Sequence, residues 1–133
     1  MTSEDRARLL EHWWEHGRLS QGDREERKAL ANGYPPGPAR AYDELSELVD
    51  EGSTKVVALL ADLVDACPTD SGPSIVGTGP LEDLVNQHGD ALISELETLA
   101  RRRPSFRSAL SSVAIEQGSI TDSAASRIDH LTS

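Results

Sequence analysis

The stretch Ile75–Val113 reads IVGTGPLEDLVNQHGDALISELETLARRRPSFRSALSSV and carries the strongest helix signals in the sequence. Pro80 suits the first position of a helix, because its fixed φ fits and its missing N–H has no intrahelical partner there. Gly89 is placed as a helix-ending glycine, and Asp90 is placed to cap the next helix. Three apolar residues lie at helical spacing between these signals: Leu81, Leu84 and Val85. The first part of the stretch therefore predicts a short amphipathic helix over residues 80–88.

The second part of the stretch predicts two further helices. One follows Asp90 and ends at the arginines 101–103, where cations suit the negative end of the helix dipole. The other begins at Pro104 and ends before Gly118. Both have apolar side chains on one face: Ala91, Leu92, Leu96, Leu99, Ala100, Phe106, Ala109, Leu110 and Val113.

Some of these residues also form a sequence pattern. They are Gly79-Pro80-Leu81-Glu82-Asp83-Leu84, His88-Gly89, Glu97, Ala100, Pro104-Ser105-Phe106-Arg107, Leu110 and Val113. The pattern resembles that of a family of small bacterial proteins of unknown function, GPLEDL…HG…E…A…P.FR..L..V. Family members often continue with tryptophan, where this sequence has Ala114. The resemblance implies a helical fold and implies no activity, because none is established for the family.

The remaining sequence also favours helices. Apolar stripes at helical spacing cover four further segments: 3–16, 39–51, 54–67 and 121–131. Residues 24–32 follow a helix-start pattern but offer few apolar side chains, and residues 33–38 predict a turn or extended Pro/Gly link. Ile75–Val76 is too short for a strand and is expected to pack as a hydrophobic staple before the helix at Pro80. Together these patterns predict an all-α fold, a single domain over residues 1–133 with about six or seven short helices.

Length and composition limit the class of protein. The chain has 133 residues, which suits one domain able to bury a core without metal or disulfide staples. Its one cysteine, Cys67, excludes an internal disulfide. No apolar run reaches the ~18 residues of a membrane span, and the charged N-terminus lacks a signal-peptide core. We therefore expect a cytoplasmic protein without membrane association.

The net charge is −10 and is unevenly distributed. Residues 51–100 contain nine acids and a single base, Lys55, whereas residues 101–133 contain three acids and five bases. This acidity argues against direct nucleic-acid binding, which needs Lys and Arg side chains facing phosphates. It favours association with a basic partner, although high solubility alone would also explain it.

One motif suggests metal chemistry. His12-Trp13-Trp14-Glu15-His16 matches H-x-x-E-H, the zinc signature of one group of metalloproteases. The two histidines are four residues apart on a helix and could share a metal, with Glu15 as a base. No downstream motif supplies a third ligand, and proteases of that type are several times longer. The sequence favours a solvated histidine pair beside a tryptophan core, and metal binding by His12 and His16 stays an alternative.

Other features have a structural explanation that the sequence favours over a chemical one. Gly77–Gly79 resembles an anion-binding turn before a helix, but it lacks the P-loop lysine and precedes two acids. Cys67 suits a small buried residue at the end of an apolar helix. Of Trp13 and Trp14, we expect one in the core and one partly exposed.

These observations lead to a functional hypothesis: a non-catalytic, acidic protein-binding module that needs no cofactor. One specific form is an immunity or inhibitor protein, from a bacterium or phage, that blocks a nuclease or another nucleic-acid-binding partner through a basic surface. The acids expected to contact that partner are Asp62, Asp65, Asp70, Glu82, Asp83, Asp90 and Glu95. Two alternatives remain open: a small metal-binding protein or metal-dependent enzyme using His12 and His16, and a structural or regulatory homo-oligomer.

Overall fold

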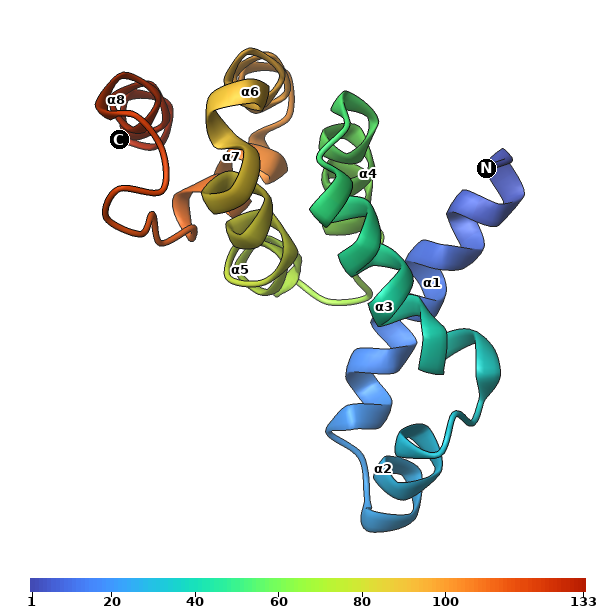
Figure 1. The fold of residues 1–133 in the computed structure, drawn as a ribbon. Coiled ribbons are helices and arrows are strands. Elements are labelled where there is room, and N and C mark those ends of the chain that lie inside the picture. The colour runs from blue at the N-terminus through green and yellow to red at the C-terminus, as the bar shows by residue number, and fades with distance from the viewer. The chain divides into compact units, whose positions relative to one another are not determined.

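The computed structural model describes all residues, 1–133, and contains eight α-helices and no strand. The helices are α1 (Ser3–Ser20), α2 (Arg24–Ala31), α3 (Pro36–Glu51), α4 (Thr54–Asp65), α5 (Gly72–Gly77), α6 (Pro80–Arg102), α7 (Pro104–Ser111) and α8 (Asp122–Thr132). The all-α prediction is confirmed, with eight helices rather than six or seven. The helices belong to two compact units, residues 1–47 and 48–133, and α3 runs from the first into the second (Figure 1).

The first unit depends on helix caps as much as on burial. At the start of α1 the Thr2 hydroxyl accepts a hydrogen bond from the Asp5 N–H at 3.1 Å, which completes a capping box. Four side chains of α1 are buried: Leu9, Leu10, Trp13 and Leu19. The helix α2 contacts α1, has its own capping box from Asp23 and Glu26, and buries no side chain. Its caps therefore explain why residues 24–31 are helical despite few apolar residues.

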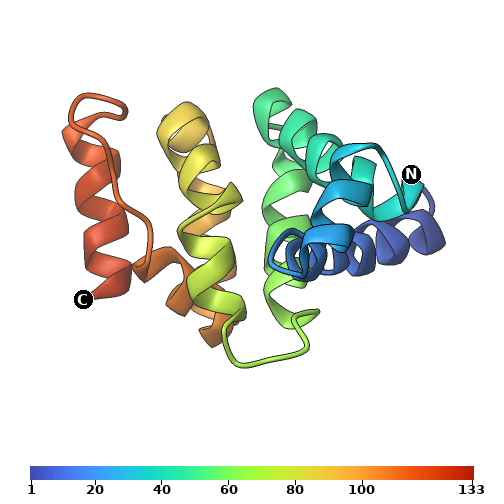
Figure 2. The same cartoon turned by 90° about the horizontal axis from the view of Figure 1, so that it is seen from below.

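The second unit is built around α6, which contacts α4, α5, α7 and α8. Figures 1 and 2 both show α6 between α4 and α8. Of the twelve residues of α4, seven are buried, including Leu60 at 0% exposure, as its apolar sequence predicts. The α6 side chains Leu81, Leu84 and Leu96 are also fully buried. The core of this unit therefore forms between α6 and the helices around it.

The predicted helix break at Gly89 is wrong, because α6 is one continuous helix over Pro80–Arg102. Gly89 is buried and has no positive φ, unlike the turn glycine Gly118. A Cβ at residue 89 would lie 2.9 Å from Cγ2 of Ile120. The glycine therefore makes room for the segment before α8 instead of ending a helix, and Asp90 lies inside α6 without capping a new helix.

Four further boundaries differ from the sequence-based expectation. The helix that begins at Pro104 ends at Ser111 and not just before Gly118, and the Ala114 N–H beyond it donates to the Glu82 carboxylate. Residues 75–76 lie in the six-residue helix α5, where Val76 is buried and Ile75 is 44% exposed. The link predicted over 33–38 ends earlier, because α3 begins at Pro36, where proline suits the first turn. The helix α1 continues past Gly17 to Ser20, because a single glycine lowers helix propensity by only about 1 kcal/mol.

Candidate functional site

Two of the acids predicted to bind a partner pair with an arginine of the same unit. Arg103, which follows α6, donates to Oδ1 of Asp62 at 2.8 Å and also pairs with the Asp65 carboxylate. The Ser105 hydroxyl donates to the other oxygen of Asp65 at 2.8 Å. The Arg103 guanidinium also donates to the Ala61 carbonyl at 3.2 Å. Asp62 and Asp65 therefore join α4 to the α6–α7 junction, and their charge is partly neutralised.

Two more of these acids hold the loop between α7 and α8. A carboxylate oxygen of Glu82 accepts from the Ala114 N–H at 2.8 Å. Asp90 accepts from the Thr121 N–H at 3.0 Å and from the Thr121 hydroxyl at 2.7 Å. Asn86, one turn from each, accepts from the Glu116 N–H at 2.8 Å. This face of α6 therefore fixes the loop through polar side chains, a role that residue spacing in the sequence does not reveal.

The other three predicted acids, Asp70, Asp83 and Glu95, are exposed and form no ion pair. Asp83 lies near three further carboxylates of the second unit. Although the side chain is exposed, neighbouring protein atoms partly desolvate the Asp83 carboxyl and raise its pKa above the ordinary value, and the negative charges of Glu82, Asp50 and Glu116 raise it further. We call Asp50, Glu82, Asp83 and Glu116 the acidic cluster. No Lys or Arg forms an ion pair with any of its members.

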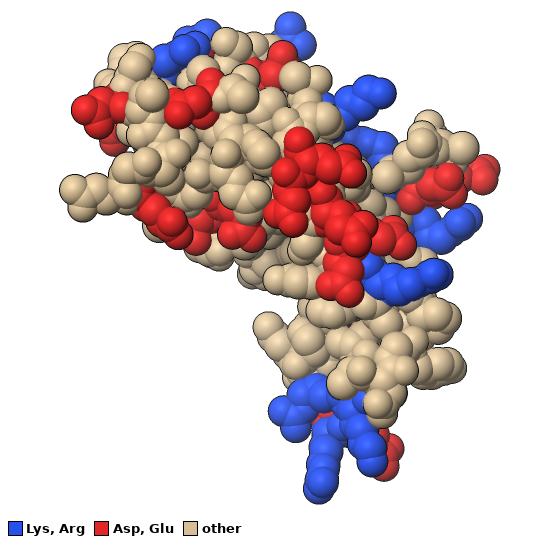
Figure 3. All heavy atoms as spheres, viewed as in Figure 1, with Lys and Arg blue, Asp and Glu red and all other residues tan.

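Acidic side chains also follow α3. Figure 3 shows red carboxylates gathered over this helix. Its exposed acids are Asp43, Glu44, Glu47, Asp50 and Glu51. None of them forms an ion pair, and the only base of the helix is Arg40. The negative potential along α3 is therefore not neutralised from within the helix.

The histidines of the H-x-x-E-H motif contact different residues of α3. The His12 ring lies against the Gly37 backbone, where an added Cβ would come within 2.4 Å of Cε1. The His16 ring stacks on Tyr42, with 5.3 Å between the ring centroids and 23° between the planes. No group of three or more His, Cys, Asp or Glu is arranged to hold a metal ion. Both rings therefore have packing roles within the first unit.

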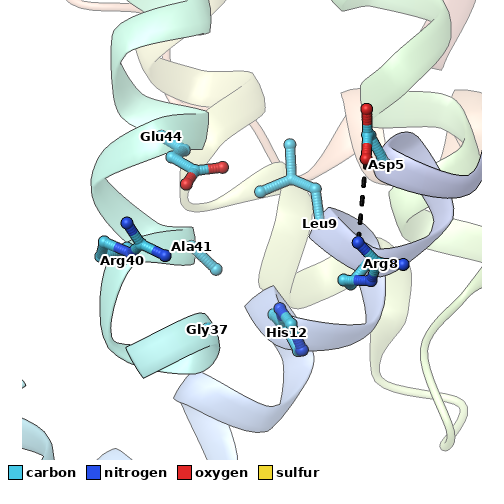
Figure 4. Close-up of a pocket in the computed structure, with 8 residues that line it drawn as sticks. All are labelled: Asp5, Arg8, Leu9, His12, Gly37, Arg40, Ala41 and Glu44. Carbon is cyan, nitrogen blue, oxygen red and sulfur yellow. Dashed lines mark ion pairs between the residues drawn. The ribbon is translucent and has the colours of Figure 1, made fainter. Parts of the chain in front are cut away.

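A small pocket opens between α1 and α3 in the first unit, with a volume of about 260 Å³ (Figure 4). It is lined by Asp5, Arg8, Leu9, His12, Gly37, Arg40, Ala41 and Glu44. The lining combines two guanidinium groups, an imidazole and two carboxylates above the apolar side chains of Leu9 and Ala41. Of this set, only His12 belongs to a motif that suggests a site, because the lining residues come from two helices that are separate in the sequence.

The tryptophans, Cys67 and the Gly77–Gly79 segment make contacts within the fold. Trp13 is buried at 8% exposure and Trp14 is half-buried, with the two rings edge to face at 4.9 Å, as expected for one core and one partly exposed ring. The Cys67 sulfur lies 3.5 Å from the Thr69 hydroxyl and is half-buried. The Thr78 hydroxyl, between Gly77 and Gly79, donates to the Ser74 carbonyl at 2.8 Å and so ties this segment to α5.

The arginines 101–103 do not act as one group. Arg101 lies 3.8 Å from Glu97, one turn earlier on α6, while Arg103 pairs with the carboxylates of α4.

No helix of the chain combines the length and the apolar character that crossing a membrane requires. The second unit presents acids on its surface above an apolar core, and the first unit contains the pocket.

The chain matches a family model but no curated protein and no solved structure. A family model matches residues 42–133, a range that contains the stretch 75–113 and the whole second unit. This range is more than half of the chain, so the protein belongs to a family of unknown function (DUF6869).

Proposed function

We propose that the protein is a non-catalytic binding module whose second unit recognises a protein with a basic contact surface. The specific form of the proposal is an immunity or inhibitor protein that blocks a nuclease or another nucleic-acid-binding protein. The observation that carries it is the acidic cluster of Asp50, Glu82, Asp83 and Glu116, which no Lys or Arg neutralises.

The acidic cluster differs from other acids of the second unit in the contacts that its carboxylates make within the fold. Asp62 and Asp65 neutralise Arg103, and Glu97 neutralises Arg127, so these carboxylates already serve the fold. Within the cluster, Glu82 is the only residue whose carboxylate accepts a hydrogen bond in the fold. Desolvation of the Asp83 carboxyl is the main reason for its raised pKa, and repulsion from Glu82, Asp50 and Glu116 adds to it. A cationic partner would relieve that repulsion, which supports a basic contact surface.

Charge also accounts for how such a complex would form. A concentrated negative field raises the association rate with a basic surface, by about tenfold or more at low salt. The effect weakens as ionic strength rises, because the Debye length is only about 8 Å at physiological salt. The proposal therefore predicts an association rate that falls steeply with added salt.

The test begins with capture of the partner from the native host and measurement of association rates at low and high salt. The diagnostic variant combines Asp50→Lys with Glu116→Lys, because both side chains are exposed and neither forms an ion pair. It should slow association about tenfold or more at low salt and have little effect at high salt. Circular dichroism should show an unchanged helical content.

The matched control combines Glu11→Lys with Asp129→Lys, which makes the same change in net charge outside the cluster. It should slow association much less than the diagnostic variant. Salt-independent rates, or equal effects of the two variants, would refute recognition by the cluster. Metal analysis of protein purified without a histidine tag tests the alternative that His12 and His16 bind metal.

A further inference from the structure

The pocket between α1 and α3 lies almost entirely outside the range of the family match. Seven of its eight lining residues precede residue 42, where that match begins. Its volume of about 260 Å³ lies below the roughly 300–1,000 Å³ of pockets for drug-sized ligands. Figure 4 shows α1 and α3 as its two walls, with Arg40 and Glu44 on α3 and Arg8 and His12 on α1. Its size suits a small metabolite.

The cationic groups of the pocket keep unused hydrogen-bond donors. Arg40 forms no ion pair, and its Nε reaches only the Pro36 carbonyl, at 3.4 Å. Arg8 makes a loose pair with Asp5, with 3.8 Å between Nη1 and Oδ1 and a side chain that is 60% exposed. Guanidinium groups bind carboxylates through paired N–H donors. The two arginines, on facing walls, therefore favour a ligand that carries a carboxylate.

The two acids of the pocket are not equivalent. Asp5 accepts the Thr2 N–H in the capping box, and hydrogen bonding to the side chain and then the backbone of Thr2 lowers the pKa of its carboxyl. Glu44 has no hydrogen-bond or ion-pair partner, although Arg40 lies one turn earlier on the same helix, a spacing at which such pairs commonly form. Its carboxylate therefore remains available for a ligand that also carries a positive group.

His12 and Gly37 close the end of the pocket. A side chain at residue 37 would meet the His12 ring, since an added Cβ would lie 2.4 Å from Cε1 and 2.7 Å from Nδ1. The glycine thus lets the imidazole lie against the α3 backbone and still line the pocket. Leu9 and Ala41 are buried and supply an apolar floor.

We propose that this pocket binds a free α-amino acid with a small aliphatic side chain. The carboxylate would lie between Arg8, Arg40 and His12, the ammonium group would pair with Glu44, and the side chain would contact Leu9 and Ala41. The proposal is independent of the acidic cluster, whose residues belong to the second unit. It also assigns a role to His12 that requires no metal.

The test is a titration of the ¹⁵N-labelled full chain, followed by amide chemical shifts, with three probes of similar carbon skeleton. L-Leucine carries both charged groups, 4-methylpentanoate lacks the ammonium group, and 3-methylbutylamine lacks the carboxylate. L-Leucine should produce saturable shifts at residues 8–12 and 37–44. Each analogue should bind about tenfold more weakly or worse, because one charge-assisted contact is lost.

Variants assign the two charges of the ligand. Arg40→Gln should weaken L-leucine binding about tenfold, and Glu44→Gln should weaken it similarly while leaving 4-methylpentanoate unaffected or tighter. Arg24→Gln and Glu25→Gln, exposed positions on α2 outside the pocket, are the matched controls and should have no effect. Gly37→Ala should weaken binding by displacing His12, whereas Gly17→Ala, which meets nothing within 4 Å, should not.

Several results would overturn the proposal. The absence of saturable shifts at millimolar L-leucine would exclude an amino-acid site. Equal affinity for L-leucine and 4-methylpentanoate would show that Glu44 binds no ammonium group. Shifts that persist in Arg40→Gln and in Glu44→Gln would place any bound ligand elsewhere.

Discussion

The two units bury apolar side chains at very different densities. Six of the buried hydrophobic residues belong to residues 1–47, whereas twenty-one belong to residues 48–133. Four of the five Trp, Tyr and Phe residues, by contrast, lie in the first unit, and Tyr34 and Tyr42 are 67% and 51% exposed there. The second unit is therefore organised by a dense core that is aliphatic apart from Phe106, and the first by helix caps, ring contacts and a few buried side chains.

This contrast coincides with the extent of the family. The matched range, residues 42–133, contains the whole densely packed unit and only the last residues of the sparsely packed one. Stability in a small domain comes mainly from buried apolar area. The second unit thus has the features of a scaffold, while the first unit supplies most of the pocket and the exposed aromatic rings.

The largest effect is expected from Leu60→Ala in the core of the second unit. Leu60 is 0% exposed on the most apolar helix, so its truncation should lower the free energy of unfolding by about 2–5 kcal/mol. Leu9→Ala in the first unit should cost less, because fewer buried side chains surround the cavity. Denaturant unfolding of both variants measures the difference, and equal losses would contradict the contrast between the units.

A smaller effect is expected where helices touch through glycine. A Cβ at Gly77 would lie 2.2 Å from the Ala109 carbonyl oxygen, and backbone cannot move aside as a flexible side chain can. Gly77→Ala should therefore lower the free energy of unfolding by about 1–3 kcal/mol, as overpacking usually does. Gly17→Ala, near the C-terminal end of α1 with open space around it, should be stabilising by up to about 1 kcal/mol. Thermal unfolding of the two variants should shift in opposite directions.

The helices were predictable where a cap and an apolar stripe agree, as in α8, where the Thr121 hydroxyl accepts from the Ala124 N–H. The prediction was wrong at Gly89 because a glycine that ends a helix and one that admits a neighbouring side chain look the same in a sequence. Only the contact with Ile120, thirty-one residues away along the sequence, distinguishes the two kinds of glycine. The short helix α5 was not foreseen for a related reason, because Gly72 and Gly77 there permit close approach to α4 and α7 instead of breaking helices.

The surface chemistry was less predictable than the fold. Composition identifies an acidic chain but does not separate Asp62, which pairs with Arg103, from Asp83, which pairs with no base. The partners of such carboxylates lie far along the sequence, so spacing contains no signal for them. The pocket was missed for the same reason, since Arg8 and Arg40 meet only when α1 and α3 pack.

The smallest expected effect concerns one ion pair in each unit and its contribution to the free energy of unfolding as pH changes. Glu97 on α6 pairs with Arg127 on α8 and is 14% exposed, and hydrogen bonding to Arg127 lowers the pKa of its carboxyl. A carboxyl whose pKa is depressed in the folded state adds stability above its unfolded pKa, ordinarily about 4.5, and loses it as pH falls through the folded pKa. Glu97→Gln should therefore destabilise the protein at pH 7, by less than either core variant, and the difference from the native chain should shrink as the pH falls below the unfolded pKa. Glu15 in the first unit also has a lowered pKa, from Arg18 on the same helix, but it is 39% exposed. Glu15→Gln should consequently change stability less at every pH, because solvent screens an exposed pair within one helix and the pair joins no second element. Urea unfolding of the three proteins between pH 3 and 7 measures both effects, and a larger loss for Glu15→Gln would show that interhelical pairing in the second unit contributes less than its burial implies.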